Sequence, residues 1–328
     1  MTTPSTSQAP LSAPRSTALS PLSAALTAAF MAALLAACGG GGGGSPPAVA
    51  TQPPVTVPEP GAPTLTGDTS LDGYNWINYR RQQTGLAALA RNPRIDLAAQ
   101  GHSNYQRQNN TITHDQTSGL PGFTGATLKD RLTNAGYALV GPFAYGEVIS
   151  AASETSGFYH AEELIGAIYH RFVILEPVFR EAGTGSATGN GYTYFTADLA
   201  ASGGYAAGVG RGQLAVYPPP NQTRVPLNFF SDTESPDPVP NQNEVGYPIS
   251  VQGDITAAVT VQTFTVRPRG GADLPVRLMT NATDRETPVK AAAIIPLSVL
   301  KAATVYDVTF TGTVDGVTAN RSWSFTTR

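Results

Sequence analysis

The sequence has few histidines that could bind a metal, and these histidines lie in different local sequences. The chain has four histidines, His102, His114, His160 and His170. His114 follows a helix-like segment, and His170 opens the apolar run Tyr-His-Arg-Phe-Val-Ile-Leu. Glu147 lies in the strand-like segment Gly-Glu-Val-Ile, where an ionised carboxylate is costly unless it is paired or hydrogen-bonded. We therefore take His114, His170 and Glu147 as candidates for chemistry and expect His102 and His160 to be structural.

Other catalytic signatures are absent from the sequence. It contains no Gly-x-Ser-x-Gly, no His-Glu-x-x-His and no phosphate-binding loop. Its single cysteine, Cys38, excludes a disulfide framework. With 20 basic and 23 acidic residues, the chain is a poor partner for nucleic acid.

The elements that must position the candidates lie between residues 71 and 200. Helical spacing, capping residues and Gly or Pro stops predict four helices, and short apolar runs predict three strands. The helices cover residues 71–85, 93–105, 127–136 and 158–168, and the strands cover 145–150, 180–186 and 192–199. Segregated helices and strands predict an α+β domain.

The region after residue 217 has a different character. Pro-rich stretches at 218–220 and 235–240 predict linker and edge segments. Residues 259–266, 289–295, 304–311 and 322–327 are β-branched or alternating, which predicts an all-β sandwich. The segments Pro-Leu-Ser-Val-Leu at 296–300, Thr-Val-Tyr-Asp-Val-Thr-Phe at 304–310 and Trp-Ser-Phe-Thr at 323–326 are similar to bacterial Ig-like domains.

The N-terminal region predicts a lipid anchor at Cys38. The apolar run Ala24–Ala37 ends in Leu-Ala-Ala-Cys-Gly, a bacterial lipobox. A run of about 14 residues is short of the roughly 20 needed to cross a bilayer, which favours a signal peptide over a membrane span. We expect cleavage before Cys38, acylation of that cysteine and stable attachment to a membrane. The residue after the cysteine is Gly39 rather than aspartate, which resembles lipoproteins that are transferred to the outer membrane.

These observations predict five segments. Residues 1–37 form the lipoprotein signal peptide, 38–68 a Gly/Pro-rich disordered tether, 69–203 the α+β domain, 204–240 a linker and 241–328 the Ig-like β-domain. The protein is expected to be a monomer in the cell envelope, either periplasmic or surface-exposed.

Seven short motifs in a fixed order resemble the CAP superfamily, the SCP-like extracellular domains, in its bacterial form. They begin at Asn78-Tyr79-Arg80 with Gly85-Leu86, and continue through His102-Ser103, His114, Asp130-Arg131-Leu132 with Gly136-Tyr137, Gly146-Glu147, His170-Arg171 and Phe179-x-Glu181-x-Gly183-x-Gly185. The resemblance covers residues 71–200. It implies an α-β-α sandwich with a cleft that holds two histidines and two acidic residues.

The resemblance assigns His114, Glu147 and His170 to this cleft. Two imidazoles and a carboxylate would leave an open position on a divalent metal such as zinc. Without metal, Glu147 would pair with an imidazolium. Glu163 is the nearest candidate for the second acid, and Glu154, Glu162 and Glu181 remain alternatives.

Two departures from the family pattern stand out. Val148 replaces the usual asparagine after the glutamate, and Ala167-Ile168-Tyr169 replaces the usual Ser-Pro-Gly before the second histidine.

The resulting functional hypothesis is a lipoprotein whose CAP domain binds a ligand, a lipid, peptide or cell-wall component, without catalysis. One alternative is a metal-dependent hydrolase of envelope peptides or glycans, in which Glu147 activates a metal-bound water. The other is a structural or adhesive surface protein.

Overall fold

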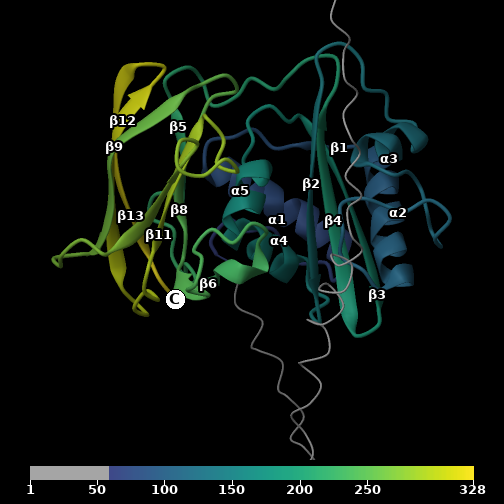
Figure 1. Cartoon of the computed structure of the whole chain (residues 1–328), viewed down its shortest axis with the longest axis horizontal. Coiled ribbons are helices and arrows are strands. Elements are labelled where there is room, and N and C mark those ends of the chain that lie inside the picture. Colours follow the sequence, from purple (N-terminus) through teal and green to yellow (C-terminus); the bar gives the residue numbers. More distant parts are fainter. Residues whose placement is uncertain (1–58) are drawn as a thin grey trace, which may run out of the picture. The chain divides into compact units, whose positions relative to one another are not determined.

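A computed structural model describes residues 59–328 (Figure 1). The predicted signal peptide, the lipidation of Cys38 and the tether up to residue 58 lie outside the described residues. Residues 59–328 belong to one compact unit. In residues 59–328, no helix has the length and apolar character needed to cross a membrane.

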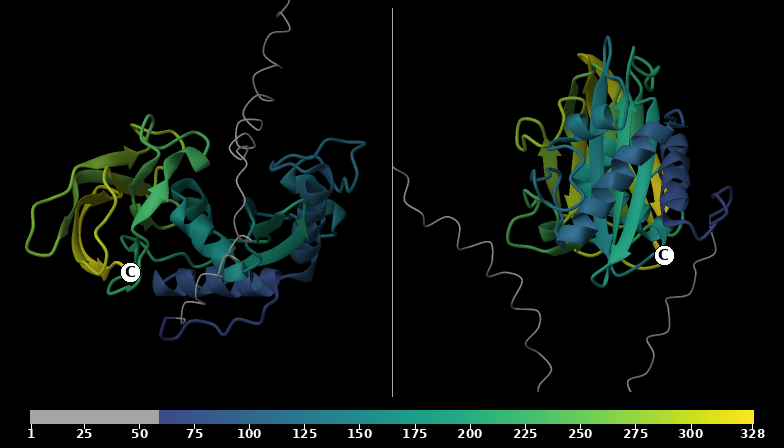
Figure 2. Two further views of the ribbon diagram at one scale, coloured as in Figure 1. Left: turned by 90° about the horizontal axis from the view of Figure 1, so that it is seen from below. Right: turned by 90° about the vertical axis from the view of Figure 1, so that its right-hand side faces the viewer.

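The first half of this unit is a three-layer α-β-α arrangement. Figures 1 and 2 show α2 and α3 on one side of a sheet, with α4 and α5 on the other. The sheet has the order β1-β3-β4-β2, with β1 parallel to β3 and the other pairs antiparallel. The helices are α1 (Thr69–Gln83), α2 (Pro93–Asn109), α3 (Leu128–Asn134), α4 (Gly157–Gly166) and α5 (Ile168–Ile174), and the strands are β1 (Ala90–Arg91), β2 (Ala144–Ala152), β3 (Glu181–Gly189) and β4 (Tyr192–Ala201).

Local capping explains where four of these helices begin. The side chains of Asp68, Asn92, Thr127 and Ser156 each accept a hydrogen bond from a backbone N–H in the first turn of their helix. Thr127 and Asp130 form a reciprocal capping box. The four predicted helices correspond to α1 to α4, and the three predicted strands to β2 to β4, each confirmed to within a few residues.

Helix α2 packs directly on the backbone of β3. A Cβ atom added to Gly183 or Gly185 would lie about 2 Å from backbone atoms of α2. Only glycine permits this approach, so the Gly-Thr-Gly segment fixes the position of α2, the helix that precedes His114.

The second half is an all-β domain of two main antiparallel sheets. Their orders are β10-β11-β8-β5 and β13-β12-β9, and a small β6-β7 pair lies beside them. Buried side chains such as Val251, Ile294, Val266, Phe310 and Phe325 form its core. The strands are β5 (Leu214–Tyr217), β6 (Asn228–Phe230), β7 (Glu244–Gly246), β8 (Ile249–Gly253), β9 (Val259–Pro268), β10 (Val276–Thr280), β11 (Ala291–Pro296), β12 (Val305–Val314) and β13 (Val317–Thr326).

The segment 204–240, predicted to be a linker, is part of the folded structure. It contains β5, which pairs with β8, β6, which pairs with β7, and the short 3-10 helix Ser231–Thr233. Its prolines predicted an extended linker without secondary structure, but its apolar residues Val216, Tyr217 and Phe229 are buried. The linker prediction is therefore wrong for most of this segment.

One continuous core joins the two halves. The cluster that contains Trp76 and Leu164 also contains Ile249 and Phe325. Arg171 of α5 lies over the rings of Tyr217 and Tyr247, at 4.5 and 5.0 Å from their centroids, and donates to Pro248 O at 2.7 Å. The all-β domain therefore packs directly against α5, the helix that carries His170.

Candidate functional site

Glu147 is the centre of the first cluster of candidate residues. It lies on β2, and its side chain is only 3% exposed. Its Oε1 accepts from His114 Nδ1 at 2.9 Å, and its Oε2 accepts from Arg131 Nη2 at 2.5 Å. Both carboxylate oxygens are therefore engaged by donors, as a buried charge requires.

The elements around Glu147 hold this cluster in place. Arg131 of α3 also donates to the backbone carbonyl of His114 at 2.8 Å, which ties the loop after α2 to α3. Because Nδ1 of His114 donates to Glu147, its Nε2 remains on the outer side of the ring. The side chain of His114 is 60% exposed.

The charge state of Glu147 follows from these contacts. Burial alone raises the pKa of the carboxyl, but the hydrogen bond from His114 and nearby positive charge, including Arg131, outweigh burial and lower that pKa. Glu147 is thus ionised at neutral pH.

Asp198 lies beside Glu147 and was not identified from the sequence. The two residues are direct partners in the register of β2 and β4. Asp198 is fully buried, and no donor in residues 59–328 binds either of its carboxyl oxygens, although the neutral acid can itself donate to Glu147. Burial, and then the charge of Glu147, raise the pKa of Asp198 well above its usual range, so Asp198 is protonated. The sequence signal that could have identified Asp198 is an acidic residue within the otherwise largely apolar strand 192–199.

His170 belongs to a separate pair. Its Nδ1 lies 2.9 Å from Glu234 Oε1, and the Glu234 side chain is 1% exposed. The same oxygen accepts from the backbone N–H groups of Tyr169 at 2.8 Å and His170 at 3.3 Å. Glu234 therefore orients the imidazole and also satisfies orphan donors of the first turn of α5.

This double role explains the departure at residues 167–169. Ala167 occupies the N-cap position of α5 and has no side-chain oxygen to offer. Glu234, from the segment after β6, supplies the missing acceptor. Sequence analysis missed Glu234 because it lies 64 residues from His170; the available signal was an uncapped helix start.

The predicted second acids have other partners. Glu163 of α4 accepts from Ser150 Oγ at 2.5 Å, and burial raises the pKa of Glu163 despite that bond and the nearby charge of His170. Glu162 pairs with Arg80 at 2.6 Å.

Of the two remaining alternatives, Glu181 accepts from Asn92 and Tyr137, and Glu154 contributes its backbone carbonyl to His160. The carboxylate bonded to His170 is that of Glu234.

His102 and His160 have the contacts expected of structural histidines. Both rings are buried, and both nitrogens of each ring have partners. Burial lowers the pKa of each imidazole, so both are neutral at pH 7. His102 Nε2 lies 4.0 Å from Glu147 Oε1 but is bonded to the carbonyl of Thr113 at 2.7 Å.

The residues present do not fit a metal held by His114, Glu147 and His170. Within residues 59–328, no three His, Cys, Asp or Glu side chains converge as ligands. Glu147 uses its oxygens on His114 and Arg131, while His170 is bonded to Glu234. The structure brings His114 and Glu147 together, whereas the side chain of His170 is bonded to Glu234.

Two solved structures are similar to part of the chain. No curated protein matches the sequence. Among solved structures, an extracellular protein containing an SCP domain from Bacillus anthracis is 24% identical, with a TM-score of 0.34, over 40% of this chain and 39% of that one. An outer surface protein of Borrelia burgdorferi is 16% identical, with a TM-score of 0.33, over 39% of this chain and 89% of that one.

The family model for CAP, the Cysteine-rich secretory protein family, matches residues 74–199. This range contains β1 to β3, α2 to α5 and most of α1 and β4, with His114, Glu147 and His170. The chain therefore carries a CAP domain at residues 74–199.

Proposed function

We propose that this protein binds an amphipathic ligand at His114 and that it does so without catalysis. The observation that carries the proposal is the contrast between an exposed imidazole and the buried carboxylate beneath it. Glu147 fixes the ring through Nδ1, so Nε2 is presented outward in a defined orientation. A fixed polar group at the surface can recognise a ligand without rearrangement.

The same geometry argues against the hydrolase alternative. A general base must reach the proton that it removes and must be free to accept it. Glu147 is buried, ionised and occupied by two donors, one of them the guanidinium of Arg131. Its lowered pKa makes it a weak base as well.

Exposed rings near this site favour a ligand with an apolar part. Tyr145 lies two residues before Glu147 on β2 and therefore points to the same side of the sheet. Tyr145 stacks on Phe143 with 6.3 Å between ring centroids, and Lys129 lies 5.7 Å from the Phe143 ring. Both rings are more than one-third exposed. A lipid with an anionic head group offers complementary chemistry, and an apolar peptide is the other candidate.

The lipobox supports a location for this activity. Acylation at Cys38 would attach the protein to the cell envelope, and Gly39 favours the outer membrane. There the CAP domain would face lipids and cell-wall material, with the all-β domain as an Ig-like spacer in a monomeric protein.

The test is titration of isotope-labelled protein with oleate and, separately, with trileucine, followed by the backbone amide resonances around residues 114, 131 and 147, which the variants retain. Saturable shifts that His114→Ala weakens about tenfold support the proposal, because that loss equals about 1.4 kcal/mol. His170→Ala is the matched control, since His170 is held by Glu234. Binding of neither probe, or equal losses in both variants, contradicts the proposal.

A further inference from the structure

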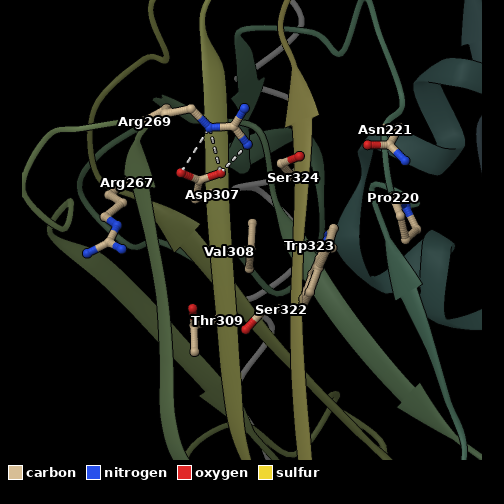
Figure 3. Close-up of a pocket in the computed structure, with 10 residues that line it drawn as sticks. All are labelled: Pro220, Asn221, Arg267, Arg269, Asp307, Val308, Thr309, Ser322, Trp323 and Ser324. Carbon is tan, nitrogen blue, oxygen red and sulfur yellow. Dashed lines mark hydrogen bonds and ion pairs between the residues drawn. The ribbon is translucent and has the colours of Figure 1, made fainter.

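A groove of about 490 Å³ lies on the all-β domain and involves none of the residues around His114. It crosses β9, β12 and β13 (Figure 3). Asp307 and Thr309 of β12 lie opposite Ser324 and Ser322 of β13 in the strand register, so these four side chains share one face. That face points outward, because the intervening Val308 and Trp323 are buried.

The lining of the groove is polar and carries an excess of positive charge. Arg269 pairs with Asp307 at 2.7 Å and thereby neutralises the carboxylate. Arg267 lies opposite Asp307 in the register of β9 and β12, and after Arg269 its charge also lowers the pKa of that carboxyl, but within residues 59–328 no carboxylate is bonded to Arg267. This second guanidinium can therefore bind an anion, on a chain whose formal net charge is −3.

Hydroxyl groups continue along the same sheet beyond the groove. Thr263 and Thr311 are hydrogen-bonded across β9 and β12 at 2.6 Å, and Thr260 and Thr313 at 2.7 Å. Such a face offers donors and acceptors but no apolar pocket for a peptide side chain. Sugar hydroxyls and ring oxygens match this lining.

A second hollow of about 320 Å³ adjoins the groove. The two share Pro220 and Asn221 in their walls, and the second is also lined by Tyr79 and Gln83 of α1. Tyr79 is partly exposed and presents an aromatic ring. Glu59, which also lines this hollow, and Glu162 both pair with Arg80, at 2.7 and 2.6 Å, so the excess of positive charge lies in the groove and not in this hollow. Two adjoining open hollows suit an extended chain better than a compact small molecule.

We propose that this pair of hollows binds an acidic oligosaccharide, with a carboxylate on Arg267 and sugar hydroxyls on Thr309, Ser322 and Ser324. The site would allow the all-β domain to hold an anionic glycan while the CAP domain binds its own ligand. No covalent chemistry is involved.

The experiment is calorimetric titration of the full-length protein with hexagalacturonate, maltohexaose and hexaglutamate. Hexagalacturonate is expected to bind saturably and to weaken with added salt, whereas the neutral sugar and the acidic peptide bind at least about tenfold more weakly. Arg267→Gln should lower the affinity for hexagalacturonate about tenfold, because it removes a charge-assisted contact.

Arg277→Gln is the matched control, since Arg277 is an exposed arginine on β10 in the other sheet. It should leave the affinity unchanged. The proposal is overturned if maltohexaose binds as tightly as hexagalacturonate, if hexaglutamate does so, or if both arginine variants lose affinity equally. Ser322→Val, which removes only a hydroxyl, should cost a few-fold in affinity and leave the salt dependence intact.

Discussion

Replacement of Glu234 by alanine tests whether the all-β domain supports the CAP domain. One carboxylate oxygen accepts from the backbone N–H groups of Tyr169 and His170 and from His170 Nδ1. Loss of a helix cap costs about 0.5–2 kcal/mol, and loss of a hydrogen bond to a charged group about 1.5–3 kcal/mol. Because these bonds share one oxygen, we expect a combined loss of about 3 kcal/mol.

The assay is thermal and denaturant unfolding of wild type, Glu234→Ala and Glu234→Gln. A loss of about 3 kcal/mol corresponds to a fall in Tm of about 5 °C for residues 59–328, at about 2.1 cal/mol/K of unfolding entropy per residue. Glu234→Gln should fall between the other two, because its amide oxygen can still accept but carries no charge. One cooperative transition is expected for each protein, since both domains share a core.

Glu244→Ala provides the matched control for this prediction. Glu244 lies on β7, is exposed and accepts from Asn228 at 2.7 Å. Its removal should change stability by less than about 0.5 kcal/mol. In the wild type, the neutral ring of His170 should carry its proton on Nδ1, which donates to Glu234. In Glu234→Ala, NMR should show that the Nδ1 tautomer is no longer preferred. Equal stability losses for the two alanine variants, with an unchanged tautomer, would refute the reasoning.

Two further outcomes concern the pair of acids on β2 and β4. Glu147→Gln should destabilise the protein by about 3–5 kcal/mol, because it leaves Arg131 charged and buried. Since folding lowers the pKa of Glu147, the ionised carboxylate stabilises the folded protein above the usual carboxyl pKa, and this stabilisation is lost as the pH falls through the pKa of Glu147 in the folded protein. Denaturant midpoints measured across acidic pH should show this loss. A midpoint independent of pH would count against it. Asp198→Asn should stabilise the protein by about 1–3 kcal/mol at neutral pH. Because folding raises the pKa of Asp198, the wild-type protein loses stability as the pH rises above the usual carboxyl pKa, and asparagine removes this loss. An unchanged or lower free energy of unfolding in the variant would contradict this.

Local sequence signals were sufficient for the helices and strands of the CAP domain. Asn92 with Pro93, and Thr127 with Asp130, mark helix starts through contacts within a few residues. The replacement of asparagine by Val148 is also explained locally, since this side chain faces the core and is fully buried. The pairing of His114 with Glu147 agrees with the pairing considered for a site without metal.

Long-range contacts account for what the sequence did not reveal. Asp198 carries no motif, and its importance comes from the register that places it beside Glu147. Helix α5 is only seven residues long and lacks a side-chain cap, so its signal was too weak to predict. Strands β5 and β8 were missed because proline and glycine neighbours hid short apolar runs that are paired and buried in the structure.

The contacts of α5 indicate that the two domains depend on each other. A helix of seven residues that begins at Ala167 would be marginal alone. In this protein Glu234 caps its first turn, and Tyr217 and Tyr247 cover Arg171 in its second. All three supporting residues lie beyond residue 199, where the CAP match ends. The position of His170 is therefore set by the all-β domain, so the CAP domain requires residues outside its own family boundary to complete its fold.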